Sequence, residues 1–322
     1  MLNLGVLGPG HIAESFAAAA KKSKAKLYAV ASRDIKKANA FKNKYGFKVA
    51  YGDYESMMKD KKVDCVYIAT PHSHHYEHML LALKYNKHII CEKAFTVNAK
   101  QAKHIFRIAK QKKLFVMEMT KIWFNPLYLE LKRVIDTKTY GAIKKIEVYF
   151  ERFLDPIKID RIINPNLAGG ALLDLGIYSI SLVNMMLGAP KTITGGAKFY
   201  KTGVDHTHTL TYKYKDATAK LVTSSNKEGK QEAIITLEKA IIKVPLFSRP
   251  EEVSIFNKQN KLLVSLKLKY QTNSLEHELD EAIRCLELRL LESPLLPPQQ
   301  TIKIMEQMDK IRKNWNLKYP ME

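Results

Sequence analysis

A glycine-rich turn near the start of this 322-residue chain has the spacing that binds the phosphates of a dinucleotide. The turn reads Gly8-Pro9-Gly10-His11-Ile12-Ala13, in the form G-x-G-x-x-A, and it stands between a strand pattern and a helical pattern. Gly8 permits the tight turn, Gly10 lets backbone N–H groups approach a pyrophosphate, and Ala13 keeps helix and strand close. The N-terminus of the helix then faces the phosphates. We therefore expect a dinucleotide to bind at Gly8, Gly10, His11, Ile12 and Ala13.

The end of the second expected strand bears on which dinucleotide binds. An NAD site usually carries an Asp or Glu there, about 20 residues past the glycines, that binds the ribose 2′-hydroxyl. This chain has Ser32 and Arg33, and a hydroxyl with a guanidinium suits a 2′-phosphate. Asp34 is interpreted as the N-cap of the next helix. In the alternative, Arg33 is a solvated loop residue and Asp34 contacts the ribose. We expect NADP rather than NAD.

Strand and helix patterns alternate over the first part of the chain, which is typical of a parallel sheet with helices on both faces. Strands are expected at residues 2–7, 27–31, 63–69, 88–91 and 114–118. Helices are expected at residues 12–21, 35–45, 76–85 and 99–111. Ligands of such sheets bind beyond the carboxyl ends of the strands. Polar residues stand at four of those ends: Ser32, Thr70, Glu92 and Glu118.

The pattern changes near Asn125-Pro126. Further strands are expected at residues 146–150, 210–214, 219–223, 233–237 and 262–268. Helices are expected at residues 127–134, at 172–187 and from Asn273, where Glu276 follows as in a capping box. We predict an α/β Rossmann domain over residues 1–122, followed over residues 123–322 by an α+β domain with a mostly antiparallel, open-faced sheet. The C-terminal helices could pack back on the first domain.

The composition argues against several other classes of protein. The net charge of +21 comes mostly from lysines spread along the whole chain, without a nucleic-acid motif, so we expect a solvated surface and no nucleic-acid partner. The charge should still help to attract an anionic cofactor. No apolar run approaches the ~18 residues of a membrane helix, and the first residues lack a signal-peptide pattern. Cys65, Cys91 and Cys285 are widely spaced, which fits a cytoplasmic protein without disulfides or a zinc site.

Three further segments complete an ordered set of motifs. They are Thr70-Pro71-His72-Ser73-His74-His75, Cys91-Glu92-Lys93-Ala94 and Gly169-Gly170-Ala171-Leu172-Leu173-Asp174-Leu175-Gly176-Ile177-Tyr178. With the glycine turn, these segments resemble the Gfo/Idh/MocA oxidoreductase family. Within it they resemble the branch of dihydrodiol dehydrogenases and NADP-dependent xylose dehydrogenases. The resemblance runs over essentially the whole chain.

The resemblance implies which residues meet the cofactor and the substrate. In the family, the lysine of a Glu-Lys-Pro segment reaches the nicotinamide and the substrate, and Lys93 matches it. The family's aspartate matches Asp174, and a tyrosine typical of the branch matches Tyr178. These two residues are i and i+4 on the expected helix, so both should face the same way. Cofactor contacts are implied at Ala69, Thr70, His72, His75, Glu92 and Lys93.

The three residue types suit the proton movement that accompanies hydride transfer. A tyrosine has an ordinary pKa of ~10, too high for a good base at neutral pH. A nearby Lys93 cation would favour the phenolate. Our hypothesis is that Tyr178 is the acid/base, Lys93 tunes it and binds the substrate oxygen, and Asp174 orients the substrate or the lysine. The reversed assignment, with Lys93 as the proton carrier, remains open.

Two segments depart from the family pattern. Ala94 replaces the proline of Glu-Lys-Pro; if the family's Lys-Pro bond is cis, either the bond is trans here and Lys93 shifts, or a disfavoured cis bond is kept. The segment Lys121-Ile122-Trp123-Phe124 stands where the branch has Trp-Thr-Arg-Phe, so the stacking wall and fixed charge that bear on the branch's substrates are replaced here. We expect Lys121, Trp123 and Phe124 to line the substrate site, with a plain surface role as the alternative for the first two.

These features predict an NADP-dependent dehydrogenase or reductase that acts on a sugar, a cyclic diol or a small carbonyl compound. The alternative is a non-catalytic NADP-binding sensor or regulator. We expect no metal, because no Cys or acidic residue completes a site beside the histidines at 72, 74 and 75. His206 and His208 are interpreted as structural. By analogy with the family we expect a homodimer, and we expect no membrane partner.

Overall fold

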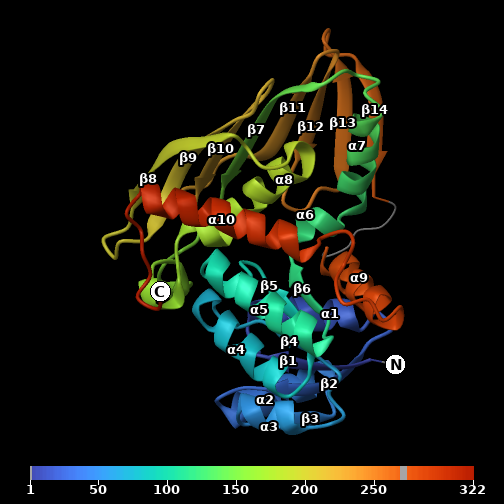
Figure 1. Ribbon diagram of the computed structural model, residues 1–322, viewed down its shortest axis with the longest axis vertical. Coiled ribbons are helices and arrows are strands. Elements are labelled where there is room, and N and C mark those ends of the chain that lie inside the picture. The colour runs from blue at the N-terminus through green and yellow to red at the C-terminus, as the bar shows by residue number, and fades with distance from the viewer. Residues whose placement is uncertain (1, 269–273) are drawn as a thin grey trace. The chain divides into compact units, whose positions relative to one another are not determined.

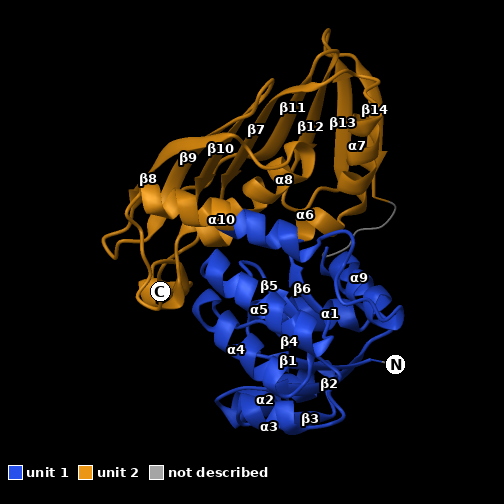
Figure 2. Cartoon of the chain, viewed as in Figure 1, with its two compact units in different colours: residues 1–120, 272–305 blue, residues 121–271, 306–322 orange. Residues whose placement is uncertain are grey.

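The computed structural model describes residues 2–268 and 274–322. Residues 1–120 with 272–305 form unit 1, and residues 121–271 with 306–322 form unit 2 (Figure 2). Segment 272–305 lies outside the predicted boundaries of the first domain, but its place in unit 1 fits the expectation that C-terminal helices could pack back on that domain. Helix α9 (Leu275–Glu287) lies in this unit and contacts α1 (His11–Ala20). Its side with Leu275, Leu279 and Ala282 is buried. The predicted start of that helix, Asn273, lies outside the described residues.

Unit 1 contains a six-stranded parallel sheet in the order β3-β2-β1-β4-β5-β6 (Figure 1). Its strands are β1 (Asn3–Leu7), β2 (Lys26–Ala31), β3 (Val49–Tyr51), β4 (Cys65–Ile68), β5 (His88–Glu92) and β6 (Val116–Met119). Its further helices before β6 are α2 (Ile35–Tyr45), α3 (Tyr54–Lys59), α4 (His72–Lys84) and α5 (Ala99–Lys112). The strand order reverses between β1 and β4, and the crevice beyond the strand ends at this point is where ligands of such sheets bind. The predicted Rossmann fold is confirmed.

Two parts of unit 1 differ from the sequence-based expectation. Strand β3 and helix α3 were not predicted, because each is short and β3 has only half-buried residues. Helix α4 begins at His72, four residues before the predicted start. Its first turn is polar and follows Pro71 without a side-chain cap, so the apolar pattern becomes visible only from Met79. The histidines of the second motif therefore lie on a helix.

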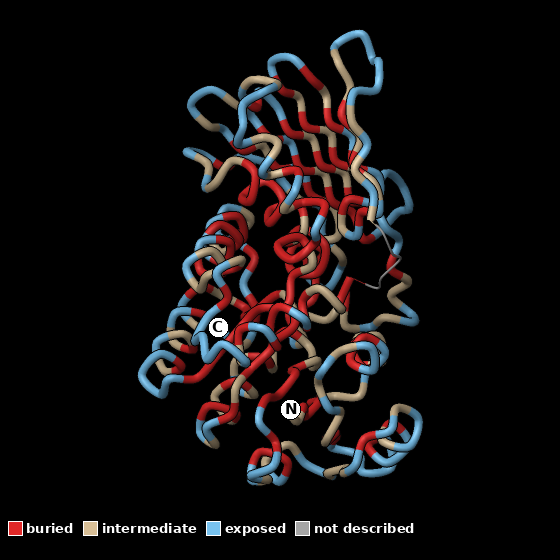
Figure 3. Tube along the Cα trace, turned by 90° about the vertical axis from the view of Figure 1, so that its right-hand side faces the viewer, coloured by how far each residue is buried: buried red, intermediate tan, exposed pale blue. Residues whose placement is uncertain are grey.

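Unit 2 contains an eight-stranded sheet in the order β14-β13-β12-β11-β7-β10-β9-β8. All its neighbouring strands are antiparallel except β7 and β10, so the predicted mostly antiparallel sheet is confirmed. Buried residues alternate with more exposed ones along the strands (Figure 3), as in a sheet with one covered face. The strands are β7 (Ile143–Glu151), β8 (Thr192–Phe199), β9 (Asp205–Lys213), β10 (Thr218–Ser224), β11 (Gln231–Leu237), β12 (Ala240–Pro245), β13 (Glu252–Asn257) and β14 (Leu262–Lys267).

The helical segments of unit 2 are mostly short. They are α6 (Lys121–Phe124), α7 (Pro126–Asp136), the 3₁₀ turns η1 (Asp160–Ile162) and η2 (Pro165–Leu167), the π-helical turn η3 (Leu172–Gly176) and α8 (Ile177–Leu187). Helix α10 (Pro298–Asn314) follows α9; its residues up to 305 belong to unit 1 and the rest to unit 2. The helix expected at residues 172–187 is therefore π-helical over its first five residues. We attribute the missed turn to the hydrophobic pattern, which is nearly continuous here and carries no periodicity.

One helical stretch, Pro165–Leu187, is long and apolar enough to cross a membrane by length and composition, contrary to the expectation that no such run exists. Within its apolar window 89% is buried inside the protein, and core helices pass the same test. The stretch is therefore weak evidence for a membrane span.

Candidate active site

The glycine turn after β1 has the backbone and the open space that a dinucleotide needs. Gly8 has a φ of +84°, and a Cβ there would lie 3.0 Å from Thr70 Cγ2. Gly8 therefore suits both the left-handed conformation and the close packing against the end of β4. At Gly10, where α1 begins, a Cβ would have no described heavy atom outside its immediate chain neighbours within 4 Å. This opening at a helix N-terminus fits an incoming pyrophosphate.

The three side chains after Gly10 differ in their exposure to solvent. His11 is almost fully exposed, Ile12 is half-buried and Ala13 is completely buried against the sheet. A larger residue than alanine at position 13 would separate helix and strand. These residues were predicted to contact the cofactor, and that contact stays a prediction.

Of the three polar residues that follow β2, two hydrogen-bond the backbone and one is exposed to solvent. Asp34 Oδ1 accepts hydrogen bonds from the backbone N–H groups of Lys36 (2.9 Å) and Lys37 (3.5 Å), so the predicted N-cap is confirmed. Ser32 Oγ accepts from the Asp34 N–H (3.2 Å). Arg33 is exposed. The Asp34 carboxylate, just beyond the end of β2, thus caps a helix.

His75 joins the backbone at the ends of two neighbouring strands. It is completely buried, with Nε2 2.7 Å from the Thr70 carbonyl oxygen and Nδ1 2.9 Å from the Ala94 carbonyl oxygen. Burial lowers the pKa of its imidazole to about 4, so the ring is neutral at pH 7 and donates a hydrogen bond to one of the two carbonyls. His72 is also buried, and its ring lies edge-on to that of His75. Both residues were predicted to bind the cofactor, and that contact stays a prediction. Both ring nitrogens of His75 face backbone carbonyls.

Lys93 follows β5, and its bond to Ala94 is cis. Of the two alternatives for the replaced proline, the structure therefore has the cis peptide. The preceding residue, Glu92, is buried and accepts a hydrogen bond from the Tyr67 hydroxyl (2.6 Å). Tyr67 in turn stacks on Phe16. Sequence reasoning missed Tyr67 as the partner of Glu92, because the two residues are 25 positions apart and meet only across the folded sheet.

Glu118, at the end of β6, binds the backbone just beyond Lys93. Its Oε1 accepts from the Phe95 N–H (3.1 Å), and its Oε2 accepts from the Thr301 hydroxyl (2.9 Å). Burial, together with the charge of Glu92, raises the pKa of Glu118 to about 7. Thr301 stands 183 residues further along the chain, and no sequence signal connected the two.

Asp174 in unit 2 is held by an arginine that sequence reasoning missed. Its carboxylate is buried and accepts from both Arg161 Nη1 (3.1 Å) and Nη2 (3.3 Å). Such a bidentate pair fixes the plane of the carboxylate. Arg161 lies in the 3₁₀ turn η1, outside every motif in the sequence.

Asp174 and Tyr178 lie on two kinds of helix. The expectation that residues i and i+4 face the same way assumed one continuous α-helix. Asp174 lies in the π-helical turn η3, whereas Tyr178 lies in the first turn of α8. A π turn holds one more residue than an α turn, and such turns are frequent at functional sites. The half-buried Tyr178 ring meets Phe150 edge-to-face at 5.7 Å.

The start of this helix is anchored by buried groups. Asp205 Oδ2 accepts from the Leu172 N–H (2.9 Å) and from His208 Nδ1 (3.0 Å). Gly170, with a φ of +106°, leaves no room for a Cβ beside Asp205. The Tyr319 hydroxyl donates to the Gly169 carbonyl (2.6 Å). These contacts fit the structural interpretation of His208.

The residues predicted to line the substrate site form α6 in unit 2. Trp123 and Phe124 are buried, so neither has a plain surface role, while Lys121 is half-buried. Among the described residues, the Trp123 indole N–H has no hydrogen-bond partner. A role of these three residues in substrate binding stays a prediction.

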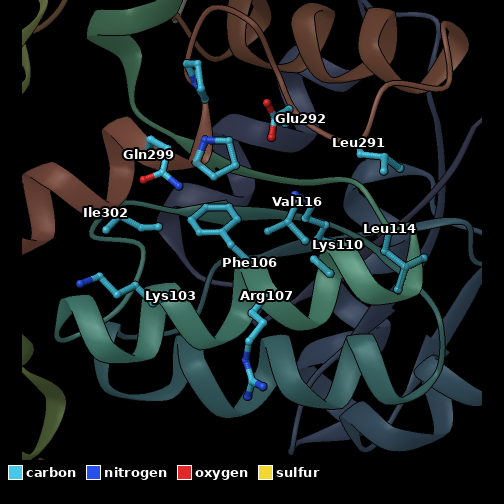
Figure 4. Close-up of a pocket in the computed structure, with 13 residues that line it drawn as sticks. Lys103, Phe106, Arg107, Lys110, Leu114, Val116, Leu291, Glu292, Gln299 and Ile302 are labelled. Carbon is cyan, nitrogen blue, oxygen red and sulfur yellow. The ribbon is translucent and has the colours of Figure 1, made fainter.

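A cleft of about 630 Å³ lies elsewhere in unit 1, between α5 and residues 291–302 (Figure 4). Phe106 projects from α5 toward the segment that carries Gln299, and Ile302 and Val116 also line the cleft. None of the predicted site residues lines it. Among residues 2–268 and 274–322, no group of three His, Cys, Asp or Glu side chains could hold a metal ion.

Comparisons with known proteins agree with this architecture. Residues 2–120 match the model of an oxidoreductase family with an NAD-binding Rossmann fold, and residues 128–243 match the GFO/IDH/MocA C-terminal domain. The chain is 30% identical over 247 residues to trans-1,2-dihydrobenzene-1,2-diol dehydrogenase of Xenopus tropicalis, which covers 75% of this chain and 74% of the relative. Identity to the Danio rerio enzyme of the same name is 32% over 250 residues, covering 76% and 74%.

Solved structures share the fold at lower identity. A 3-ketoreductase from Actinomadura kijaniata, in complex with NADP and TDP-benzene, superposes with a TM-score of 0.87 at 22% identity over 97% of each chain. Levoglucosan dehydrogenase, in complex with NADH and levoglucosan, superposes with a TM-score of 0.88 at 16% identity over 100% of each chain. From the two matched domains and the curated relatives, we conclude that the chain belongs to the Gfo/Idh/MocA family of oxidoreductases.

Proposed function

We propose that this oxidoreductase uses NADP to transfer hydride to or from a sugar, a cyclic diol or a small carbonyl compound. The observation that carries the proposal is the arrangement at one edge of the unit 1 sheet. Strands β1, β4 and β5 are adjacent and parallel, so the glycine turn, Thr70 and Lys93 stand at neighbouring strand ends. The relatives named as dihydrodiol dehydrogenases act on a diol, which supports the substrate class.

The chain's own residues would bind the dinucleotide and move a proton. The open N-terminus of α1 at Gly10 would hold the pyrophosphate. When bound, the nicotinamide supplies or accepts the hydride. Lys93 would bind the substrate oxygen and favour the phenolate of Tyr178, and Tyr178 would take up or return the hydroxyl proton. Asp174, oriented by Arg161, would orient the substrate or the lysine.

The choice of NADP rests on Arg33 and Asp34. Asp34 caps α2, while the exposed Arg33 guanidinium can pair with a 2′-phosphate. Replacement of Arg33 by alanine should lower kcat/KM for NADP about 10- to 100-fold, the value of one charge-assisted hydrogen bond, and leave that for NAD within about twofold. The matched control is Lys36→Ala, which removes a nearby exposed cation and should change neither value by more than about twofold. An equal loss for both cofactors in Arg33→Ala would contradict NADP selection by this residue.

The function itself is tested with aldoses, dihydrodiols and dicarbonyls, each with NADP(H) and with NAD(H), by following the absorbance of the reduced nicotinamide. We expect turnover of at least one of these substrate classes, faster with NADP(H). Tight NADP binding without turnover of any class would instead favour a sensor or regulator.

A homodimer is proposed from the uncovered face of the unit 2 sheet. Half-buried Tyr149, Val222 and Ile234 lie on three adjacent strands, β7, β10 and β11, and alternate with the fully buried residues of the opposite face. A second copy could bury these apolar groups. Light scattering should give twice the mass of one chain, and Val222→Lys should shift the protein toward the monomer.

A further inference from the structure

Side chains from two other elements of unit 1 contact the backbone that follows Lys93. The Ala94 carbonyl lies 2.9 Å from Nδ1 of His75 on α4, and the Phe95 N–H donates to Oε1 of Glu118 at the end of β6, at 3.1 Å. These contacts lie one and two residues beyond Lys93. The turn is therefore held by side chains at the point where strand pairing has ended.

Each of the two side chains is also anchored on its far side. His75 Nε2 lies 2.7 Å from the Thr70 carbonyl, and Glu118 Oε2 accepts from Thr301 at 2.9 Å. His75 is 0% exposed and Glu118 is 2% exposed. Glu118 accepts a hydrogen bond with each of its two oxygens, whereas the neutral imidazole of His75 donates to one of its two neighbouring carbonyls. Both side chains are shielded from water and have little freedom, so each transmits its position to the turn.

The chemistry of the two residues argues against plain core packing. Burying an ionisable group costs free energy that an apolar residue of similar size would not. At Glu118 this cost shows as a raised pKa, which the nearby charge of Lys93 opposes. The carboxylate thus interacts favourably with the lysine that it helps to place.

We propose that Glu118 and His75 are positioning residues for Lys93, acting as a clamp on the Lys93–Ala94–Phe95 turn. The importance of this clamp for turnover rests on the proposed function. The clamp itself is a property of unit 1 that can be measured without turnover.

The first test is amide hydrogen exchange at Phe95, measured by NMR on the phenylalanine-labelled full chain without cofactor. Glu118→Leu removes the acceptor, so exchange at Phe95 should become about tenfold faster or more, the value of one hydrogen bond. Glu118→Gln keeps an acceptor oxygen and should restore slow exchange. The control is Glu281→Leu, which removes another buried carboxylate of unit 1, one that accepts from Ser293 and Arg284. It should leave exchange at Phe95 unchanged relative to the rest of the unit.

The second test separates kcat from KM with a substrate that the wild type turns over. Displacement of Lys93 should lower kcat about tenfold or more in Glu118→Leu and His75→Leu, and in Glu118→Leu the Kd of NADP should stay within about twofold. Glu118→Gln should recover most of kcat, and Glu281→Leu should keep it.

Unchanged Phe95 exchange in Glu118→Leu would overturn the clamp. Faster exchange without a loss of kcat, or a failure of Glu118→Gln to restore both values, would overturn the positioning role of the clamp for Lys93. If the wild type turns over no substrate, the proposed function fails, while the exchange measurement still decides whether the clamp exists.

Discussion

The Lys93 turn of unit 1 and the Asp174 helix of unit 2 hold their chemical groups in different ways. In unit 1, fully buried titratable side chains bind the backbone beside Lys93. In unit 2, the Asp174 carboxylate itself is bound by Arg161, whose side chain is 40% exposed. Because the groups that hold the Lys93 turn can titrate, we expect the stability of the first region to depend on pH. Because Asp174 is held by an ion pair, we expect the stability of the second region to depend on the single charge of Arg161.

The largest expected effect lies in unit 2, at the proposed acid/base. Tyr178→Phe removes the hydroxyl and leaves the ring that contacts Phe150. Because general acid–base catalysis contributes about 10²- to 10⁴-fold, kcat should fall by that factor while the Kd of NADP stays within about twofold. Near-normal kcat in Tyr178→Phe would show that this residue carries no proton and would favour the reversed assignment to Lys93.

The next effect tests pH sensitivity in unit 1. The folded-state pKa of Glu118, about 7, lies above its ordinary 4.5, so its contribution to stability is full below pH 4.5 and is lost as pH rises through 7. The folded-state pKa of His75, about 4, lies below its ordinary 6.5, so its contribution is full above pH 6.5 and is lost as pH falls through 4. Between these limits the two slopes oppose each other.

Glu118→Gln removes the contribution of Glu118, so the free energy of unfolding of the variant should follow the pH dependence that His75 alone produces. The free energy of unfolding of this variant, relative to wild type, should rise by about 2 kcal/mol between pH 4.5 and pH 7, since one proton per pH unit is worth about 1.4 kcal/mol. Urea unfolding at four pH values measures the difference. Parallel pH curves for the two proteins would mean that Glu118 does not titrate in this range.

A smaller effect is expected from the ion pair of unit 2. Arg161→Leu leaves Asp174 buried without its bidentate partner, which should lower the free energy of unfolding by about 1–2 kcal/mol after allowance for the half-exposed arginine. Arg133→Leu breaks an exposed pair with Glu130 and should cost less than about 0.5 kcal/mol. Equal urea midpoints for the two variants would remove the distinction between a built pair and a surface pair.

The smallest expected effect compares two glycines with equally open surroundings. A Cβ at Gly10 in unit 1 or at Gly196 in unit 2 would meet no described heavy atom beyond its immediate chain neighbours within 4 Å, so alanine at either position should leave the melting temperature unchanged. Only Gly10→Ala should weaken NADP binding, by about tenfold, because the pyrophosphate must approach the backbone there. Titration calorimetry gives both Kd values. Equal affinities would place the dinucleotide elsewhere.

Local rules predicted much of unit 1 and little of the support around the site. The helix at residues 35–45 and its Asp34 cap follow from a short polar pattern, and the structure has both. The Arg161–Asp174 pair and the Glu118–Thr301 contact depend on side chains brought together by the folded chain, so no local pattern reveals them. The π turn is hidden because a continuously apolar segment has no period to read.

The proposed hydride transfer is tested most directly by isotope transfer from NADPH deuterated at C4 of the nicotinamide. With a carbonyl substrate that the protein reduces, mass spectrometry of the product should find one deuterium on the new carbinol carbon. The same product formed in heavy water with unlabelled NADPH should carry none there after exchange of its hydroxyl. Deuterium on that carbon from heavy water, and none from the nicotinamide, would contradict hydride transfer by this protein.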